Sequence, residues 1–295
     1  MFKNVPLCTI LFLFAGYTVF GQQTAESELY DSLRHKSNVR SRSELSLYFG
    51  GGQSALNYKP DVGAHMSEIG GIVGVSYSWF MTKRWGVVTG FEVALFRAEY
   101  IADEYYSGSY SATSGSSLQS LGDDFIFSFE YQDLKEKQSV IFMQIPVMTK
   151  FQTKHFFASA GIKIGIPAEA KFEVTATELN TAGYFPYENQ TYYEPVELGF
   201  GVYGPVSYSA NLDINFLFSA AFEAGGQIYL GNRTKLSAGF WLDYGLNDLN
   251  RAIKKPIVEY DLTVSGNLKC NSVFHKIDRI STISAGLMLR IIHIF

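Results

Sequence analysis

The chain has 295 residues, of which 47% are hydrophobic, 16% aromatic and only 18% charged, with 27 glycines and a net charge of −4. Beyond the N-terminus, no apolar run approaches the roughly 18 to 20 residues that a membrane helix needs, which excludes a helical membrane protein. The net charge provides no basic stripe, so nucleic acid is not expected as a partner.

The N-terminus has the organisation of a secretory signal peptide, residues 1–21. Lys3 gives the basic start, residues 7–14 form the apolar core, and cleavage is expected after Gly21. Residues 22–43 are polar and are predicted to form a flexible periplasmic lead-in. Cleavage would leave Cys270 as the only cysteine, which excludes an internal disulfide and a thiolate metal cluster, and no cofactor is implied.

From residue 44 onward, apolar side chains alternate with Gly, Ser, Ala and Gln. In the first run, Leu45, Leu47 and Phe49 fall on one face, as in a half-buried strand. About eight such runs are present, at 44–56, 70–80, 87–95, 140–151, 156–166, 216–228, 236–246 and 280–295. Most of them exceed the 5 or 6 residues that are usual in soluble sheets, which suits tilted membrane-spanning strands.

The links between the runs alternate between long and short. The long links cover residues 57–69, 100–137, 167–213 and 247–279, and the others are turns of about three to five residues, as in outer-membrane barrels. The second face carries few charges, unlike the polar face of a soluble sandwich. We therefore predict an all-β domain at 44–295, an eight-stranded antiparallel transmembrane β-barrel in the outer membrane of a Gram-negative bacterium, with short periplasmic turns and long extracellular loops. A secreted β-sandwich or soluble barrel is the alternative.

The C-terminus carries the pattern that the bacterial barrel-assembly machinery reads. Phe295 is a terminal aromatic residue, and four residues precede it on the same strand face: Leu287, Leu289, Ile291 and His293. Outer-membrane lipid and this machinery are therefore expected partners. His293 is expected at the wet headgroup level rather than in a catalytic role.

Two strand segments carry a resemblance to a known family. The segments MQIPVMTKF (143–151) and GFWLDYGLND (239–248), with a signal peptide cut before Gln22, are similar to the PorT-like outer-membrane β-barrel proteins of Bacteroidota. The resemblance covers about residues 44–295. It implies a barrel without catalytic residues, and some members of that family are accessory parts of the type IX secretion and gliding apparatus.

Five charged residues are predicted to meet inside the barrel: Glu92, Lys163, Glu223, Asp243 and Arg290. All face inward by parity, and their heights above the periplasmic strand ends agree within about 10 Å. An eight-stranded barrel has room only for side chains, and an unpaired charge inside it would be costly. We therefore predict a structural ion-pair network that plugs the lumen, with the inward Trp241 adding bulk. A gated small pore and a proton- or ligand-linked site are the alternatives.

The loops are rich in tyrosine, which suits recognition of glycans or proteins, although mutual packing of the tyrosines would explain them equally. Residues 125–131 and 171–177 are predicted to extend the fourth and fifth strands upward. His65 and Ser67 are similar to the His-x-Ser pair of outer-membrane lipid A deacylases, but they are expected on a polar loop.

The function predicted from the sequence is a non-enzymatic scaffold or accessory subunit of an envelope machine, with envelope proteins as partners. A small gated channel and, less favoured, a lipid-modifying enzyme are the alternatives.

Overall fold

The computed structural model describes residues 42–102, 104–113, 124–261 and 268–295. The predicted signal peptide and residues 22–41 of the predicted lead-in lie outside this part. The first strand begins at Arg42, inside the segment predicted as lead-in. None of the helices in the described part is long and apolar enough to cross a membrane.

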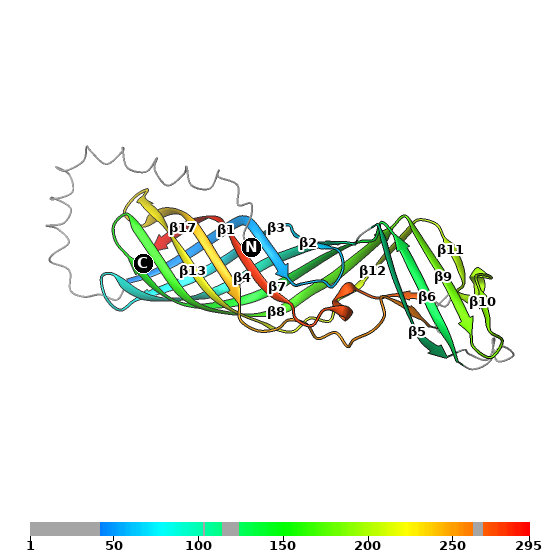
Figure 1. Ribbon diagram of the computed structural model, residues 1–295. Coiled ribbons are helices and arrows are strands. Elements are labelled where there is room, and N and C mark those ends of the chain that lie inside the picture. The colour runs from blue at the N-terminus through cyan, green and yellow to red at the C-terminus, as the bar shows by residue number, and fades with distance from the viewer. Residues whose placement is uncertain (1–41, 103, 114–123, 262–267) are drawn as a thin grey trace, which may run out of the picture. The chain divides into compact units, whose positions relative to one another are not determined.

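Eight antiparallel strands close into a barrel (Figure 1). They are β1 (Arg42–Asn57), β3 (Ile69–Phe80), β4 (Trp85–Ile101), β7 (Lys135–Gln152), β8 (Phe156–Ala176), β13 (Leu217–Tyr229), β14 (Thr234–Gly245) and β17 (Ser281–Ile294). Each pairs with the next in this order, and β17 returns to β1 with Glu44 opposite Ile294 and Asn57 opposite Ser281. The predicted eight-stranded antiparallel barrel is therefore confirmed. A sandwich of two sheets would have left open edges.

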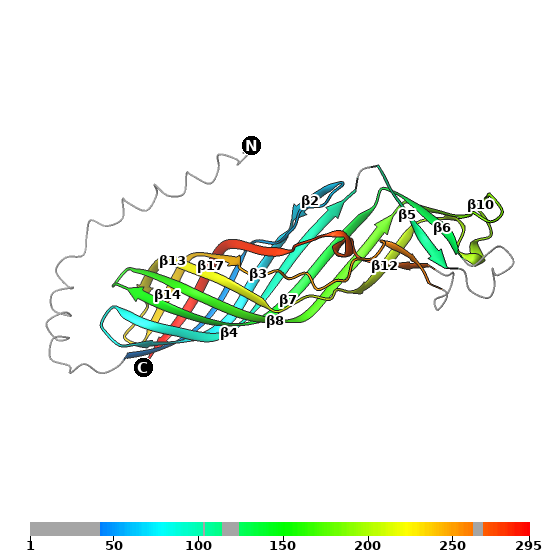
Figure 2. The same ribbon diagram turned by 60° about the horizontal axis from the view of Figure 1, so that its bottom comes forward.

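The turns 81–84, 153–155 and 230–233 connect strands at one end of the barrel, and the long links lie at the other. The first residues of β1 and the last of β17 pair at the end with the short turns. Figure 2 shows the same ring of strands from a second direction. The alternation of long and short links was therefore predicted correctly.

An apolar belt surrounds the barrel on its outward face. On β4 it runs from Trp85, which is 50% exposed, through Phe91, which is 49% exposed, to Leu95. The next outward residues are Arg97 and Glu99, so the belt ends there. A continuous apolar band of this kind is the surface that a barrel presents to lipid.

A second sheet is built from the two longest links. It contains β5 (Tyr105–Thr113), β6 (Asp124–Gln132), β9 (Glu178–Phe185), β10 (Gln190–Tyr192) and β11 (Gly201–Tyr203). Its inner face is aromatic, and the buried rings are those of Phe125, Phe127, Phe129, Tyr131, Phe185 and Phe200. The tyrosine-rich loops are therefore folded into a sheet whose buried rings continue the hydrophobic core of the barrel.

One predicted strand extension is wrong and the other is confirmed. Residues 125–131 form β6 in the second sheet, because Asp133, with φ of 54°, breaks the strand before β7 starts. Residues 171–176 do continue β8. The remaining elements are short: β2 (Ala64–Ser67), η4 (Val196–Leu198), β12 (Val206–Asn211), β15 (Val258–Tyr260), β16 (Leu268–Cys270) and η6 (Val273–Lys276).

Candidate functional site: the barrel lumen and its cap

Three of the predicted lumen residues form one ion-pair group. The Lys163 ammonium lies 2.9 Å from a carboxylate oxygen of Glu92 and 2.9 Å from one of Asp243. Lys163 and Glu92 are completely buried. A single lysine on β8 thus ties together β4 and β14, which lie on either side of the lumen.

The other two predicted residues form the adjoining pair. Arg290 donates to a carboxylate oxygen of Glu223 at 2.8 Å, and its guanidinium lies 4.7 Å from the centre of the Tyr48 ring. The Tyr48 hydroxyl donates to Glu92 at 2.9 Å. The structure therefore brings all five predicted residues together, with Tyr48 as the link that sequence reasoning missed.

Trp241 fills the lumen next to this central cluster. It is completely buried, and its ring leaves no room for a side chain on the facing strands. A Cβ built on Gly286 would lie 2.2 Å from the Trp241 ring, and one on Gly50 would lie 2.9 Å from it. Glycine is thus required at Gly286 by close approach, and the inward bulk predicted for Trp241 is observed.

A second cluster, nearer the short turns, was not predicted. The Glu44 carboxylate lies 2.6 Å from the Lys235 ammonium, 3.2 Å from that of Lys150 and 2.8 Å from the Arg42 guanidinium. Gln152 donates to the same carboxylate. These positions have the inward parity of their strands and lie near the strand ends.

The buried charges of the two clusters balance. In the described part of the barrel, the buried acids in them are Glu44, Glu92, Glu223 and Asp243, and the buried bases are Lys150, Lys163, Lys235 and Arg290. Each of these acids has a base within 3.2 Å. A neutral, mutually bonded set avoids the large cost of an isolated charge in a dry interior.

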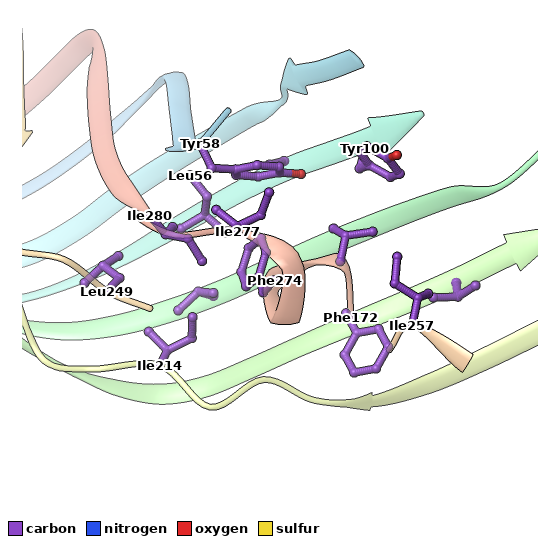
Figure 3. Close-up of a cluster of buried hydrophobic side chains, with 14 of the residues drawn as sticks. Leu56, Tyr58, Tyr100, Phe172, Ile214, Leu249, Ile257, Phe274, Ile277 and Ile280 are labelled. Atoms are coloured by element: carbon purple, nitrogen blue, oxygen red, sulfur yellow. The ribbon is translucent and has the colours of Figure 1, made fainter. Parts of the chain in front are cut away.

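The described part of the last long link folds into the opposite end of the barrel and forms a cap, residues 249–261 and 268–280 (Figure 3). Its buried apolar side chains are Leu249, Ile257, Val258, Val273, Phe274, Ile277 and Ile280. They pack with inward residues of the strands, and the Phe274 ring lies 5.2 Å from that of Tyr58, edge to face. The cap therefore occupies the barrel mouth away from the short turns.

Glu136 anchors the cap to β7. Its carboxylate accepts hydrogen bonds from the Ser272 hydroxyl, the backbone N–H of Val273 and the side chain of Gln138. The flanking outward residues, Lys135 and Lys137, lie beyond the apolar belt. Burial raises the pKa of Glu136 to about 7, and the three hydrogen bonds only partly oppose that rise.

This pKa predicts a cap that loosens as the pH rises. The carboxyl titrates near 4.5 when undocked and near 7 when docked, so docking is strongest below pH 4.5 and weakens up to pH 7. Thiol labelling of the buried Cys270 reports opening. Between pH 5 and 8, the labelling rate of the wild type relative to Glu136→Gln is expected to rise by about tenfold or more. Comparing the two proteins at each pH cancels the intrinsic reactivity of the thiol, and a constant ratio would refute the anchor.

The predicted assembly-signal residues occupy the lipid-side face of the last strand. Leu287, Leu289, Ile291 and His293 point outward from β17, and Phe295 follows it. The His293 and Phe295 rings lie 5.0 Å apart. Their reading by the assembly machinery stays a prediction.

His65 has a structural role in this fold. It lies on β2, not on a polar loop, and its Nε2 lies 2.7 Å from the backbone oxygen of Leu56. Its ring packs on Tyr58 at 4.5 Å. Burial lowers the pKa of His65. Within the described residues, no group of three or more His, Cys, Asp or Glu side chains could hold a metal ion.

Comparisons with known proteins add fold relatives only. No family model matches the chain, and no curated protein matches it. Ail, the attachment invasion locus protein of Yersinia pestis, is 12% identical, with 87% of this chain and 100% of that chain covered and a TM-score of 0.29. Neisserial surface protein A is 8% identical (84% and 95% covered, TM-score 0.29), and the outer membrane protease OmpT from Escherichia coli is 8% identical (86% and 97%, TM-score 0.31).

Proposed function

We propose that this chain is an outer-membrane barrel with a closed lumen, which serves as a non-enzymatic scaffold or accessory subunit of an envelope machine. The observation that carries the proposal is the filled interior. Two ion-pair clusters whose buried charges balance when taken together, the Trp241 ring and the loop cap occupy successive levels of one barrel. A barrel filled in this way supplies a rigid support rather than a path for solutes.

The outer surface supports the membrane placement. The apolar belt and the ring closed by β1 and β17 satisfy both demands of a bilayer, an apolar exterior and no unpaired strand edge in the ring. The second sheet then stands outside the cell for recognition. The resemblance to PorT-like proteins of Bacteroidota favours a role related to type IX secretion.

A small gated channel is the second candidate, and one feature favours it. The described residues of the cap form no strand pair with the barrel wall, and Glu136 holds the cap by side-chain hydrogen bonds. Such a segment is able to move without disturbing the ring. A lipid-modifying enzyme is less favoured, because His65 is engaged with Leu56 and Tyr58.

Two measurements test the proposal. In planar bilayers the purified barrel is expected to show no steady conductance, because the ion-pair clusters remain in place even when the cap moves. Mild crosslinking in cells followed by purification is expected to recover a discrete set of envelope proteins. Steady conductance would favour the channel, and reproducible recovery of the barrel alone would refute the accessory role.

A further inference from the structure

The second sheet has two chemically different faces. Strand register places Ser109 opposite Ser128, and Glu130 opposite both Ser107 and Asn180. These residues alternate with the buried rings of the inner face, so they share the outer face of the sheet. We call this outer face the polar face.

A hollow of about 410 Å³ lies on the polar face. Its polar and aromatic lining consists of Ser107, Ser109, Ser128, Phe129, Glu130, Asn180, Thr181 and Tyr193. Opposed residues of neighbouring strands stand about 4.5 to 5.5 Å apart, so hydroxyl, amide and carboxylate groups are spread across three strands. The hollow therefore presents a flat array of hydrogen-bonding groups.

Several of these groups have no partner of their own in the described part of the chain. Neither Ser107 nor Ser109 nor Glu130 makes a side-chain hydrogen bond or ion pair with a described residue, whereas Ser128 donates to the backbone oxygen of Ala182. The free groups can both donate and accept, which is the complement of a hydroxyl-rich ligand.

Tyrosines flank the array. Tyr193 borders the hollow and is 68% exposed, and Tyr105, which is 52% exposed, lies on the polar face two residues before Ser107. A tyrosine ring offers a rigid apolar plane with a polar tip, and it loses little conformational entropy on binding. The C–H face of a sugar ring is an apolar surface of matching size.

The charged residues around the hollow indicate which hydroxyl-rich ligands it can bind. Among the described residues, no Lys or Arg lines the hollow, so phosphate, sulfate and acidic sugars lack a counter-charge. Glu130 would repel an anion, and a carboxylate accepts strongly from sugar hydroxyls. An extended peptide would instead add to the outer edge of β5, which among the described strands pairs with β6 alone.

We infer that the polar face is a binding site for neutral glycans. Tyr193 stacks on a sugar ring, while Glu130 and the serines receive and donate hydrogen bonds. This inference rests on the proposed function, since it takes the sheet to face outside the cell. It adds the chemical class of the ligand and the residues that bind it.

The test uses the full-length protein in detergent on an array of neutral, sialylated and sulfated oligosaccharides. Neutral glycans are expected to bind, and titration calorimetry with the best of them is expected to show about tenfold weaker binding for Tyr193→Ala and for Glu130→Gln. Tyr187→Ala is the matched control, because Tyr187 is 87% exposed and does not line the hollow. Its affinity is expected to stay within about twofold of the wild type.

Three results would overturn the glycan site: no binding on the array, binding of acidic glycans only, or equal weakening by Tyr193→Ala and Tyr187→Ala. Capture of a peptide that is insensitive to Tyr193→Ala would also overturn it, in favour of the β5 edge. The same samples are run unboiled on gels and in planar bilayers. A folded barrel that shows no conductance and binds no glycan refutes only the glycan site. Steady conductance refutes the proposed function, whatever the array shows.

Discussion

Replacing Lys163 with methionine is expected to destabilise the barrel by about 3 to 5 kcal/mol, the usual cost of breaking a buried ion pair from one side. The substitution leaves Glu92 and Asp243 without their shared cation in a closed interior. A closed barrel runs faster on gels before boiling, because its ring has no edge to unzip. The fast-migrating form of Lys163→Met is therefore expected to disappear at a lower temperature than that of the wild type.

Lys154→Met is the matched control. Lys154 lies exposed in the turn between β7 and β8, so its loss is expected to change stability by less than about 0.5 kcal/mol. Adding Glu92→Gln and Asp243→Asn to Lys163→Met is expected to recover part of the loss, because amides are less costly to bury than carboxylates. If Lys163→Met and Lys154→Met lose the fast-migrating form at the same temperature, Lys163 does not stabilise the ion-pair network in the lumen.

Truncating Phe274 to alanine is expected to undock the cap. Phe274 is 1% exposed and packs against Tyr58, and removing a buried phenylalanine typically costs about 3 to 5 kcal/mol. Labelling of Cys270 is therefore expected to accelerate by at least about a hundredfold. Ile253→Ala, in the same link but 75% exposed, is expected to leave the rate nearly unchanged.

The same variant separates the two candidate functions. With the cap undocked, the protein is still expected to show no conductance in planar bilayers, because the central cluster and Trp241 remain in the lumen. Conductance that appears only in Phe274→Ala would show that the cap is the gate of a channel, and the scaffold proposal would then be wrong.

The barrel was predictable because its alternation is sharp. On β14 and β17 every second side chain meets either lipid or the lumen, so parity alone places Asp243 and Arg290 inside. The same rule predicted that all five central charged residues face the lumen, and their heights along the strands predicted that they meet. Height could be estimated because strands rise by a nearly constant amount per residue.

Three features could not be predicted from the sequence, because they depend on tertiary contacts rather than on the period of the apolar residues. Phe125 to Tyr131 alternate as a barrel strand would, but the chain breaks at Asp133, whose φ is positive, and these residues belong to the second sheet. The apolar residues of the cap follow neither a strand nor a helix period, since they fill the end of the barrel, whose shape the other loops define. Glu44 is paired with Lys150 and Lys235, which are distant in the sequence and come together only in the closed barrel.

The aromatic residues near the short turns do not all face outward. Phe80 and Tyr229 lie beside short turns, as the exposed Trp79 and Trp85 do. Phe80 is instead 2% exposed, with the Lys150 ammonium 5.6 Å from its ring, and the Tyr229 ring lies 5.6 Å from the ammonium of Lys235. Both rings therefore belong to the charged cluster around Glu44.

The bonds of Glu44 also bear on how the protein is made. Its partners Lys150 and Lys235 follow it by 106 and 191 residues, and its strand β1 cannot close the ring until β17 arrives. During synthesis Glu44 is made first, and the neutralising lysines are made much later. A chain cut short before Lys235 would hold this acid with only part of its counter-charge, and without β17 its ring would stay open. The layer nearest the short turns thus makes a stable interior available only to a complete chain.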